Sequence, residues 1–129
     1  MIKSILIVDD SRIARMMLNS CILQYKNYEI FQAEDGEKAI EKYKEIQPEV
    51  IFMDLTMPVL NGFEATKAII QINKDAIVFV ITADVQPKSI ENIAEIGAFD
   101  VIKKPPEPET IKSALIKAEE ALKQRQQTK

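Results

Sequence analysis

The chain has 129 residues, of which 47% are hydrophobic, and its 20 acidic and 17 basic residues leave a net charge of −3. This length fits one domain with a buried core, and the composition argues against a disordered chain. The acidic balance gives no support for nucleic-acid binding, which needs a basic surface. No apolar run approaches the roughly 20 residues that span a bilayer, and acidic residues come too early for a signal peptide, so we predict a cytoplasmic protein.

Apolar runs of strand length alternate with helical patterns along the chain. The predicted strands are residues 5–8, 28–33, 50–53, 76–81 and 99–103. Each strand is followed by apolar residues at helical spacing, and breaks fall at Gly36, Pro48, Pro58 and Gly97. Continuous rather than alternating apolar strands predict an α/β fold, with five helices covering both faces of a five-stranded parallel sheet. We place the domain at residues 1–123 and expect the polar residues 124–129 to form a frayed tail.

Polar residues follow four of the predicted strands. In open parallel sheets, ligands bind beyond the carboxyl ends of the strands. Asp9 and Asp10 follow the first strand, Asp54 the third, Thr82 the fourth and Lys103-Lys104 the fifth. Three neighbouring carboxylates tolerate one another only with a cation among them or after taking up protons. Oxygen ligands without His or Cys favour Mg²⁺, although Asp9 and Asp10 could instead cap the first helix.

Asp54 stands alone at the end of its strand and can act as a nucleophile. A carboxylate can accept a phosphoryl group and form an acyl phosphate. This transfer depends mainly on positioning and charge neutralisation, which Mg²⁺, Lys104 and Thr82 would supply. Because successive strand residues face opposite sides, we expect Lys103 to point away from the site.

Six segments of the chain together resemble the response-regulator receiver family: Val8-Asp9-Asp10-Ser11, Met53-Asp54-Leu55-Thr56-Met57-Pro58, Asn61-Gly62, Ile81-Thr82-Ala83, Gly97-Ala98 and Lys104-Pro105. The match extends from about Lys3 to Leu122. It implies that residues 1–123 are a receiver domain with a flavodoxin-like, doubly wound sheet. The expected strand order, 2-1-3-4-5, rests on this resemblance alone, because it is the order known for chemotaxis receivers.

The resemblance also implies residue roles. Asp54 would be the phosphoacceptor, and Mg²⁺ would be bound by Asp10, Asp54 and the backbone carbonyl of Thr56, with Asp9 helping through water. Lys104 would pair with Asp54 and then with its phosphoryl group, and its bond to Pro105 is expected to be cis. Thr82 would move to bind a phosphoryl oxygen. The face formed by the fourth helix, the fifth strand and the last helix would then change its affinity for a partner.

The function implied is that of a single-domain response regulator in a two-component phosphorelay, which is not an enzyme acting on other substrates. The chain has no histidine, so a histidine kinase or histidine phosphotransfer protein would be the donor and another protein the target. A chemotaxis-type regulator and a relay intermediate both fit, as do a monomer and a weak phosphorylation-dependent dimer. The main alternative is a degenerate receiver acting only as a binding module.

Two enzyme or cofactor interpretations are weaker. An aspartate-nucleophile phosphatase usually has a second acid where Thr56 stands. A flavin or nucleotide module would need a glycine-rich loop after the first strand, where Asp9 and Asp10 would repel an anion.

The chain departs from the receiver pattern at two positions. Val101 stands three residues before Lys104, where many receivers have Tyr or Phe, and we expect Phe99 to lie on the same strand face as Val101. Pro106 stands where an aromatic or apolar residue is common. Thr56 and Asp84 occupy variable positions that tend to tune phosphoryl lifetime.

Overall fold

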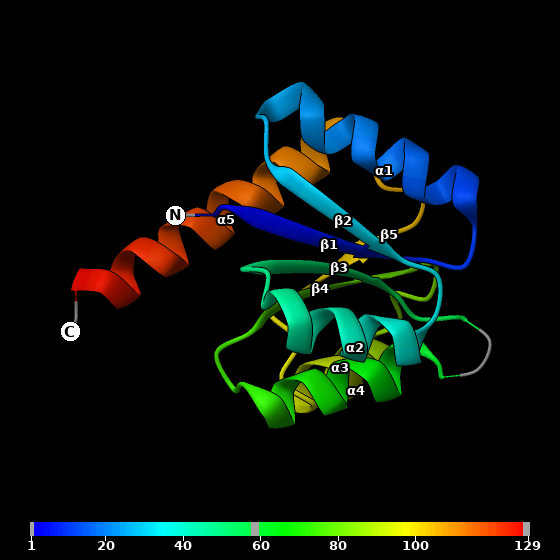
Figure 1. The fold of residues 1–129 in the computed structure, drawn as a ribbon. Helices are drawn as coiled ribbons and strands as arrows, with labels where there is room; N and C mark the ends of the chain where they lie inside the picture. The colour runs from blue at the N-terminus through cyan, green and yellow to red at the C-terminus, as the bar shows by residue number, and fades with distance from the viewer. Residues whose placement is uncertain (1, 58–59, 128–129) are drawn as a thin grey trace.

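The computed structural model describes residues 2–57 and 60–127, which alternate between five strands and five helices (Figure 1). The strands are β1 (Ser4–Val8), β2 (Glu29–Ala33), β3 (Val50–Asp54), β4 (Ile77–Thr82) and β5 (Asp100–Lys103). The helices are α1 (Arg12–Tyr25), α2 (Gly36–Ile46), α3 (Gly62–Ile72), α4 (Pro87–Glu95) and α5 (Pro108–Gln127). Pro58, in the predicted loop after β3, lies outside the described residues.

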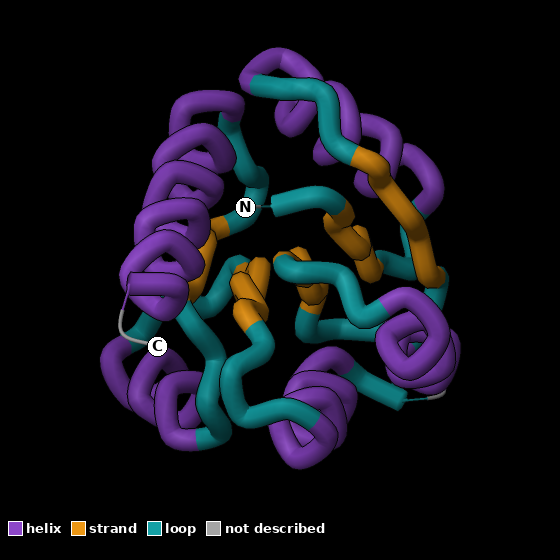
Figure 2. Tube along the Cα trace, turned by 60° about the vertical axis from the view of Figure 1, so that its left-hand side comes forward, coloured by secondary structure: helices purple, strands orange, loops and turns teal. Residues whose placement is uncertain are grey.

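All strand pairs are parallel, and their order is β2-β1-β3-β4-β5. The predicted fold class and strand order are therefore confirmed. Helices cover both faces of the sheet (Figure 2). α1 and α5 pack on one face and α2, α3 and α4 on the other. β1, β3 and β4 are buried at every residue, which explains their continuous apolar sequences.

The sheet separates two apolar layers because neighbouring residues of a strand face opposite sides. Ile7, Phe52 and Phe79 face α1 and α5, whereas Val8 and Met53 face α2 to α4. The Phe52 and Phe79 rings stack with their centroids 5.4 Å apart. Complete burial of one such side chain contributes roughly 1.5–3 kcal/mol. This packing holds the central strands, and with them the position of Asp54, in place.

Three helices begin at side chains that cap their first turn. Ser11 accepts from Ala14 N at 3.2 Å in α1, and Asp35 and Asn61 do the same for α2 and α3. Such caps satisfy N–H groups that the helix itself leaves unpaired. α4 differs, because Gln86 makes no side-chain cap and Pro87 occupies the first turn.

The last helix extends further than the sequence predicted. α5 continues to Gln127, four residues beyond the expected boundary at Lys123, and residues 128 and 129 lie outside the described part. Lys, Gln and Arg are good helix formers. Arg125 also donates from Nη1 to the Asp75 carbonyl at 2.7 Å, which ties the end of the helix to the domain. Within the described residues, no helix has the length and hydropathy needed to cross a membrane.

Candidate functional site

Four strands end at one edge of the sheet, and each brings a predicted site residue there. Asp9 follows β1, Asp54 ends β3, Thr82 ends β4 and Lys104 follows β5. The pairing of β4 with β5 continues to this edge, where Lys104 N donates to the Thr82 carbonyl at 2.9 Å. Residues that are far apart in the sequence are thus brought to the same level of the sheet.

Three carboxylates gather at this edge. Asp9, Asp10 and Asp54 each offer an oxygen such that all three oxygens lie within 4.8 Å of one another. Asp54 is 2% exposed and Asp9 8%, whereas Asp10 is exposed. Because water has little access to Asp54 and Asp9, their charges are screened less than those of surface carboxylates.

Lys104 is the basic residue of the cluster. Its Nζ lies 2.5 Å from Asp54 Oδ1, and its peptide bond to Pro105 is cis, as the family resemblance implied. The second oxygen of Asp54, Oδ2, is buried and has no hydrogen-bond partner within the described residues. A buried polar atom without a partner costs free energy. Lys104 therefore satisfies only one of the two Asp54 oxygens.

The pKa directions show that the site favours bound protons. Burial is the largest cause of the raised pKa of Asp54; the hydrogen bond from Lys104 lowers this pKa, and the charges of Asp9 and Asp10 raise it further. Burial also raises the pKa of Asp9. Burial alone would lower the pKa of Lys104, but its hydrogen bond to Asp54 and the nearby carboxylates raise it overall. The cluster attracts positive charge, whether as protons or as a cation.

This arrangement fits a hard divalent cation. The ligand atoms on offer are carboxylate oxygens, the donors that Mg²⁺ prefers. A cation beside Asp54 would also give Oδ2 the partner that it lacks within the described part of the chain. Thr56 lies in the loop after β3 with its side chain exposed, and the role of its carbonyl as a ligand stays a prediction.

Comparison with known proteins identifies the family. The family model of the response regulator receiver domain matches residues 5–116. The chain belongs to this receiver family. It is 40% identical to the chemotaxis protein CheY of Thermotoga maritima over 116 residues, which cover 89% of this chain and 96% of that protein. It is 36% identical to CheY of Bacillus subtilis over 113 residues, covering 88% and 94%.

Solved receiver structures have the same fold. CheY4 of Vibrio cholerae superposes with a TM-score of 0.83 at 29% identity, covering 92% of this chain and 99% of that one. A chain from the complex of CheX, CheY, BeF₃ and Mg²⁺ of Borrelia burgdorferi gives a TM-score of 0.82 at 27% identity, covering 89% and 87%. The resemblance that the sequence motifs indicated is thereby confirmed.

In this receiver, Arg15 supports the turn that carries the first two carboxylates. Arg15 Nη1 donates to the Asp9 carbonyl at 2.7 Å, and its Nε donates to Gln32 Oε1 at 2.9 Å. Ser11 N donates to Asp9 Oδ1 at 2.9 Å. Arg15 was not predicted from the sequence, because a polar residue within a helical pattern gives no sign that it reaches back to the preceding turn.

Gly62 lies against the backbone of Asp54. A Cβ atom at residue 62 would be 1.9 Å from the Asp54 carbonyl oxygen, so no other residue fits without moving the chain. Its N–H donates to the Leu55 carbonyl at 2.9 Å. The Asn61-Gly62 pair of the family pattern thus caps α3 with one residue and lets α3 approach Asp54 with the other.

The expectation for Phe99 is wrong. Val101 packs in the layer that faces α4, whereas Phe99 packs in the opposite layer. The ring planes of Phe99 and Phe79 make an angle of 71°, and their centroids are 5.4 Å apart. Phe99 precedes β5, so the alternation of a regular strand does not extend to it. No aromatic residue of β5 therefore takes the place of the usual Tyr or Phe at position 101.

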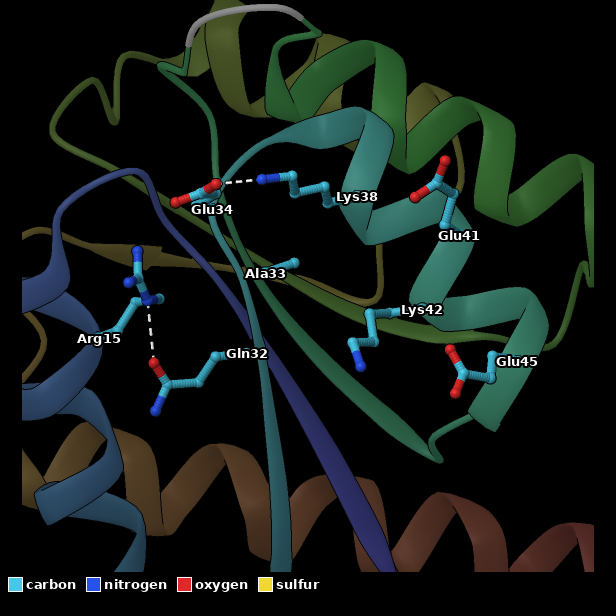
Figure 3. A pocket seen from close by; sticks show the side chains of 8 residues that line it. All are labelled: Arg15, Gln32, Ala33, Glu34, Lys38, Glu41, Lys42 and Glu45. Atoms are coloured by element: carbon cyan, nitrogen blue, oxygen red, sulfur yellow. Dashed lines mark hydrogen bonds and ion pairs between the residues drawn. The ribbon is translucent and has the colours of Figure 1, made fainter.

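Several hollows in the described part of the chain lie outside the carboxylate cluster. One, of about 410 Å³, borders β2 and α2, and its charged side chains have both signs (Figure 3). Lys38 forms an ion pair there with Glu34, and Arg15 a hydrogen bond with Gln32.

Lys103 lines another hollow, of about 480 Å³, together with the loop of residues 83–86. Of the two neighbouring lysines, Lys104 is the one that pairs with Asp54.

Proposed function

We propose that this protein is a response regulator that accepts a phosphoryl group on Asp54, with Mg²⁺ held by Asp9, Asp10, Asp54 and the Thr56 carbonyl. The observation that carries the proposal is the buried Asp54 carboxylate. One of its oxygens is bound by Lys104, the other has no hydrogen-bond partner among the described residues, and two further carboxylates lie beside it. A site built only as an ion pair would not collect this excess of negative charge.

The proposed reaction is a phosphoryl transfer from a phosphohistidine. An Asp54 oxygen attacks phosphorus, the P–N bond breaks, and its electron pair goes to the imidazole nitrogen of the donor. Lys104, which pairs with the Asp54 carboxylate before the transfer, then pairs with a phosphoryl oxygen. The Thr82 hydroxyl donates to another phosphoryl oxygen. Mg²⁺, when bound, neutralises charge on the phosphoryl oxygens. The residues of the chain contribute positioning and charge stabilisation, which is what this kind of transfer requires.

We infer that the phosphohistidine is carried by a histidine kinase or a histidine phosphotransfer protein, because these 129 residues contain no histidine. Asp54 is buried, so the donor has to pack against the carboxyl edge of the sheet. Ile13, Met16 and Met17 of α1 are exposed there. Met17 also lines a cavity of about 290 Å³ that includes Asp9, Lys104, Pro105 and Pro106. We infer that the donor binds this apolar end of α1, since exposed apolar patches mark interaction sites.

A charged substitution in α1 tests this inference. Met16→Glu changes an exposed residue of the same patch that is not among the residues lining this cavity. It should slow phosphoryl transfer from a phosphorylated kinase by about tenfold or more, the size expected for a central interface residue. Labelling by acetyl phosphate should not change, because a small donor needs no docking surface. Leu23→Glu is the matched control, since Leu23 is an exposed apolar residue near the other end of α1. Equal losses with both donors would rule out a docking role.

We further propose that the phosphorylated form signals by binding a protein target in a chemotaxis-type pathway, through the face formed by α4, β5 and α5, and that it acts on no other substrate. The curated relatives named as chemotaxis proteins and the structural neighbour from a complex of CheX with CheY support this. Pull-down with and without BeF₃⁻ tests it. A second histidine protein as the captured partner would favour a relay instead. The cytoplasmic location stays a prediction.

Labelling with acetyl phosphate tests the chemistry. The wild-type protein should take up one phosphoryl group with Mg²⁺ and none with EDTA, and Asp54→Asn should take up none. Asp75→Asn, an exposed acidic residue outside the cluster, is the control. A wild-type protein that takes up no label would favour the alternative of a degenerate receiver that acts only as a binding module.

A further inference from the structure

The loop between β4 and α4 ties the site to the first turn of α4 by three hydrogen bonds. Asp84 N donates to Thr82 Oγ1 at 3.1 Å. The Asp84 carboxylate accepts from Gln86 N at 3.1 Å through Oδ1 and from Ser89 Oγ at 2.6 Å through Oδ2. Asp84 is thus the link between the buried hydroxyl of Thr82 and a side chain of α4.

Both ends of this link are anchored. The Thr82 carbonyl accepts from Lys104 N, and the carbonyl before it, that of Ile81, accepts from Leu55 N. The backbone of Thr82 is therefore fixed between β3 and β5. At the other end, Ile93 of α4 is 2% exposed and packs in the core. The Thr82 side chain and the loop of residues 83–86 lie between these two anchors.

Ser89 holds the α4 end of the link. Gln86, the residue at the N-cap of α4, makes no capping bond with its side chain. Asp84 is the acidic group at this helix start, where negative charge is favoured. Its bonds from Ser89 and Gln86 lower the pKa of Asp84, so the carboxylate stays charged at neutral pH. The Ser89 hydroxyl therefore binds a charged acceptor, which makes the bond stronger than one between neutral groups.

The Thr82 hydroxyl does not contact the buried Asp54 oxygen. Asp54 Oδ2 has no hydrogen-bond partner within the described residues, while Thr82 Oγ1 is held by Asp84 N. Thr82 Oγ1 only accepts in this bond, so its O–H group remains able to donate. A shift of the hydroxyl toward a phosphoryl group on Asp54 would lengthen the bond from Asp84 N, or carry Asp84 with it and away from Ser89.

We propose that Ser89 is a positioning residue that acts through Asp84 to hold the Thr82 hydroxyl away from Asp54 in the unphosphorylated protein. This inference rests on the proposed function. It also gives phosphorylation a route to α4 that needs no aromatic residue at position 101, where this chain has Val. Loss of the Ser89 hydroxyl favours the phosphoryl-bound state, because one bond that resists the change is gone.

The test is titration of ¹⁵N-labelled protein with BeF₃⁻, a phosphoryl mimic, at saturating Mg²⁺. Ser89→Ala should bind BeF₃⁻ about two- to tenfold more tightly than the wild type, which is the effect of one net hydrogen bond. Ser89→Thr keeps the hydroxyl and should restore the wild-type affinity. Ser113→Ala, an exposed serine of α5, is the control for a Ser to Ala change within a helix.

The outcomes separate the two proposals. Unchanged or weaker binding by Ser89→Ala, or the same shift in Ser89→Thr, overturns the role of Ser89 while the proposed function stands. A wild-type protein that does not bind BeF₃⁻ overturns the proposed function itself. The amide resonances of Asp84 and Ser89 give a second readout, since they should shift on BeF₃⁻ binding in the wild type.

Discussion

Replacing Asp9 by Asn should stabilise the metal-free protein. The substitution removes one of three clustered charges and keeps the oxygen that accepts from Ser11 N. The carboxylate oxygens lie within 4.8 Å of one another. Two unit charges at that distance repel by about 1 kcal/mol in water and about 3.5 kcal/mol at an effective dielectric constant of 20. The lost attraction to Lys104 offsets part of this gain, so we expect the free energy of unfolding to rise by about 1 kcal/mol.

The assay is urea unfolding at neutral pH, in EDTA and in Mg²⁺, with Asp75→Asn as the control. Mg²⁺ binds only the folded site and should therefore raise the free energy of unfolding of the wild type. It should raise that of Asp9→Asn much less, because the variant has one ligand charge fewer. The electrostatic reasoning is refuted if Asp9→Asn is no more stable than the wild type in EDTA, or if Mg²⁺ stabilises both proteins equally.

Three more predictions concern the same site. Lys104→Ala should bind Mg²⁺ several-fold more tightly, because the variant lacks the ammonium group that lies 2.5 Å from Asp54 and competes with the cation. Acetyl phosphate should nevertheless label this variant at least about tenfold more slowly than the wild type. Unchanged labelling would contradict the role of Lys104. Gly62→Ala should lower the free energy of unfolding by about 2 kcal/mol or more, measured by urea unfolding, and a neutral effect would contradict the close approach to Asp54. The pKa values of Asp9 and Asp54 are raised in the folded protein. Above about pH 4, the folded metal-free protein therefore binds more protons than the unfolded chain. The stability that these two groups contribute is lost as the pH rises through their raised pKa values. The fall should be smaller in Asp9→Asn and absent with saturating Mg²⁺; a wild type that behaves like the variant at every pH would argue against it.

The edge that carries the site could be predicted from sequence because buried parallel strands have continuous apolar sequences. In such a strand, the first polar residue after the run stands at the carboxyl end. Asp9, Asp54 and Thr82 follow runs of this kind. Strand alternation indicated that Lys103 and Lys104 face opposite sides, and the choice of Lys104 came from the family pattern, in which the site lysine precedes a proline. The strand order, in contrast, came from the family resemblance, since the spacing of elements does not determine which strands are neighbours.

Other features of the site could not be predicted, because they depend on side-chain packing that the spacing of apolar residues in the sequence does not indicate. Arg15 reaches the Asp9 carbonyl because of the shape of one turn. Phe99 lies outside the regular part of β5, so a face assigned by counting residues was wrong. The hydrogen bond from Ser89 to the Asp84 carboxylate joins residues that are five positions apart across the start of α4. Its connection to the site depends on the Thr82 hydroxyl, which accepts from Asp84 N. That Asp54 Oδ2 has no hydrogen-bond partner among residues 2–57 and 60–127 follows from the three-dimensional arrangement, and no sequence pattern indicates it.

The most direct test of the central claim is to locate the phosphoryl group on the chain. After acetyl phosphate and Mg²⁺ treatment, borohydride reduces an aspartyl phosphate to homoserine, which tandem mass spectrometry can place in the sequence. Phosphorylation at Asp54 predicts homoserine at position 54 alone, and none when Mg²⁺ is removed before labelling. Homoserine at Asp9 or Asp10, or its absence from position 54 in fully labelled protein, would contradict the assignment of the phosphoacceptor.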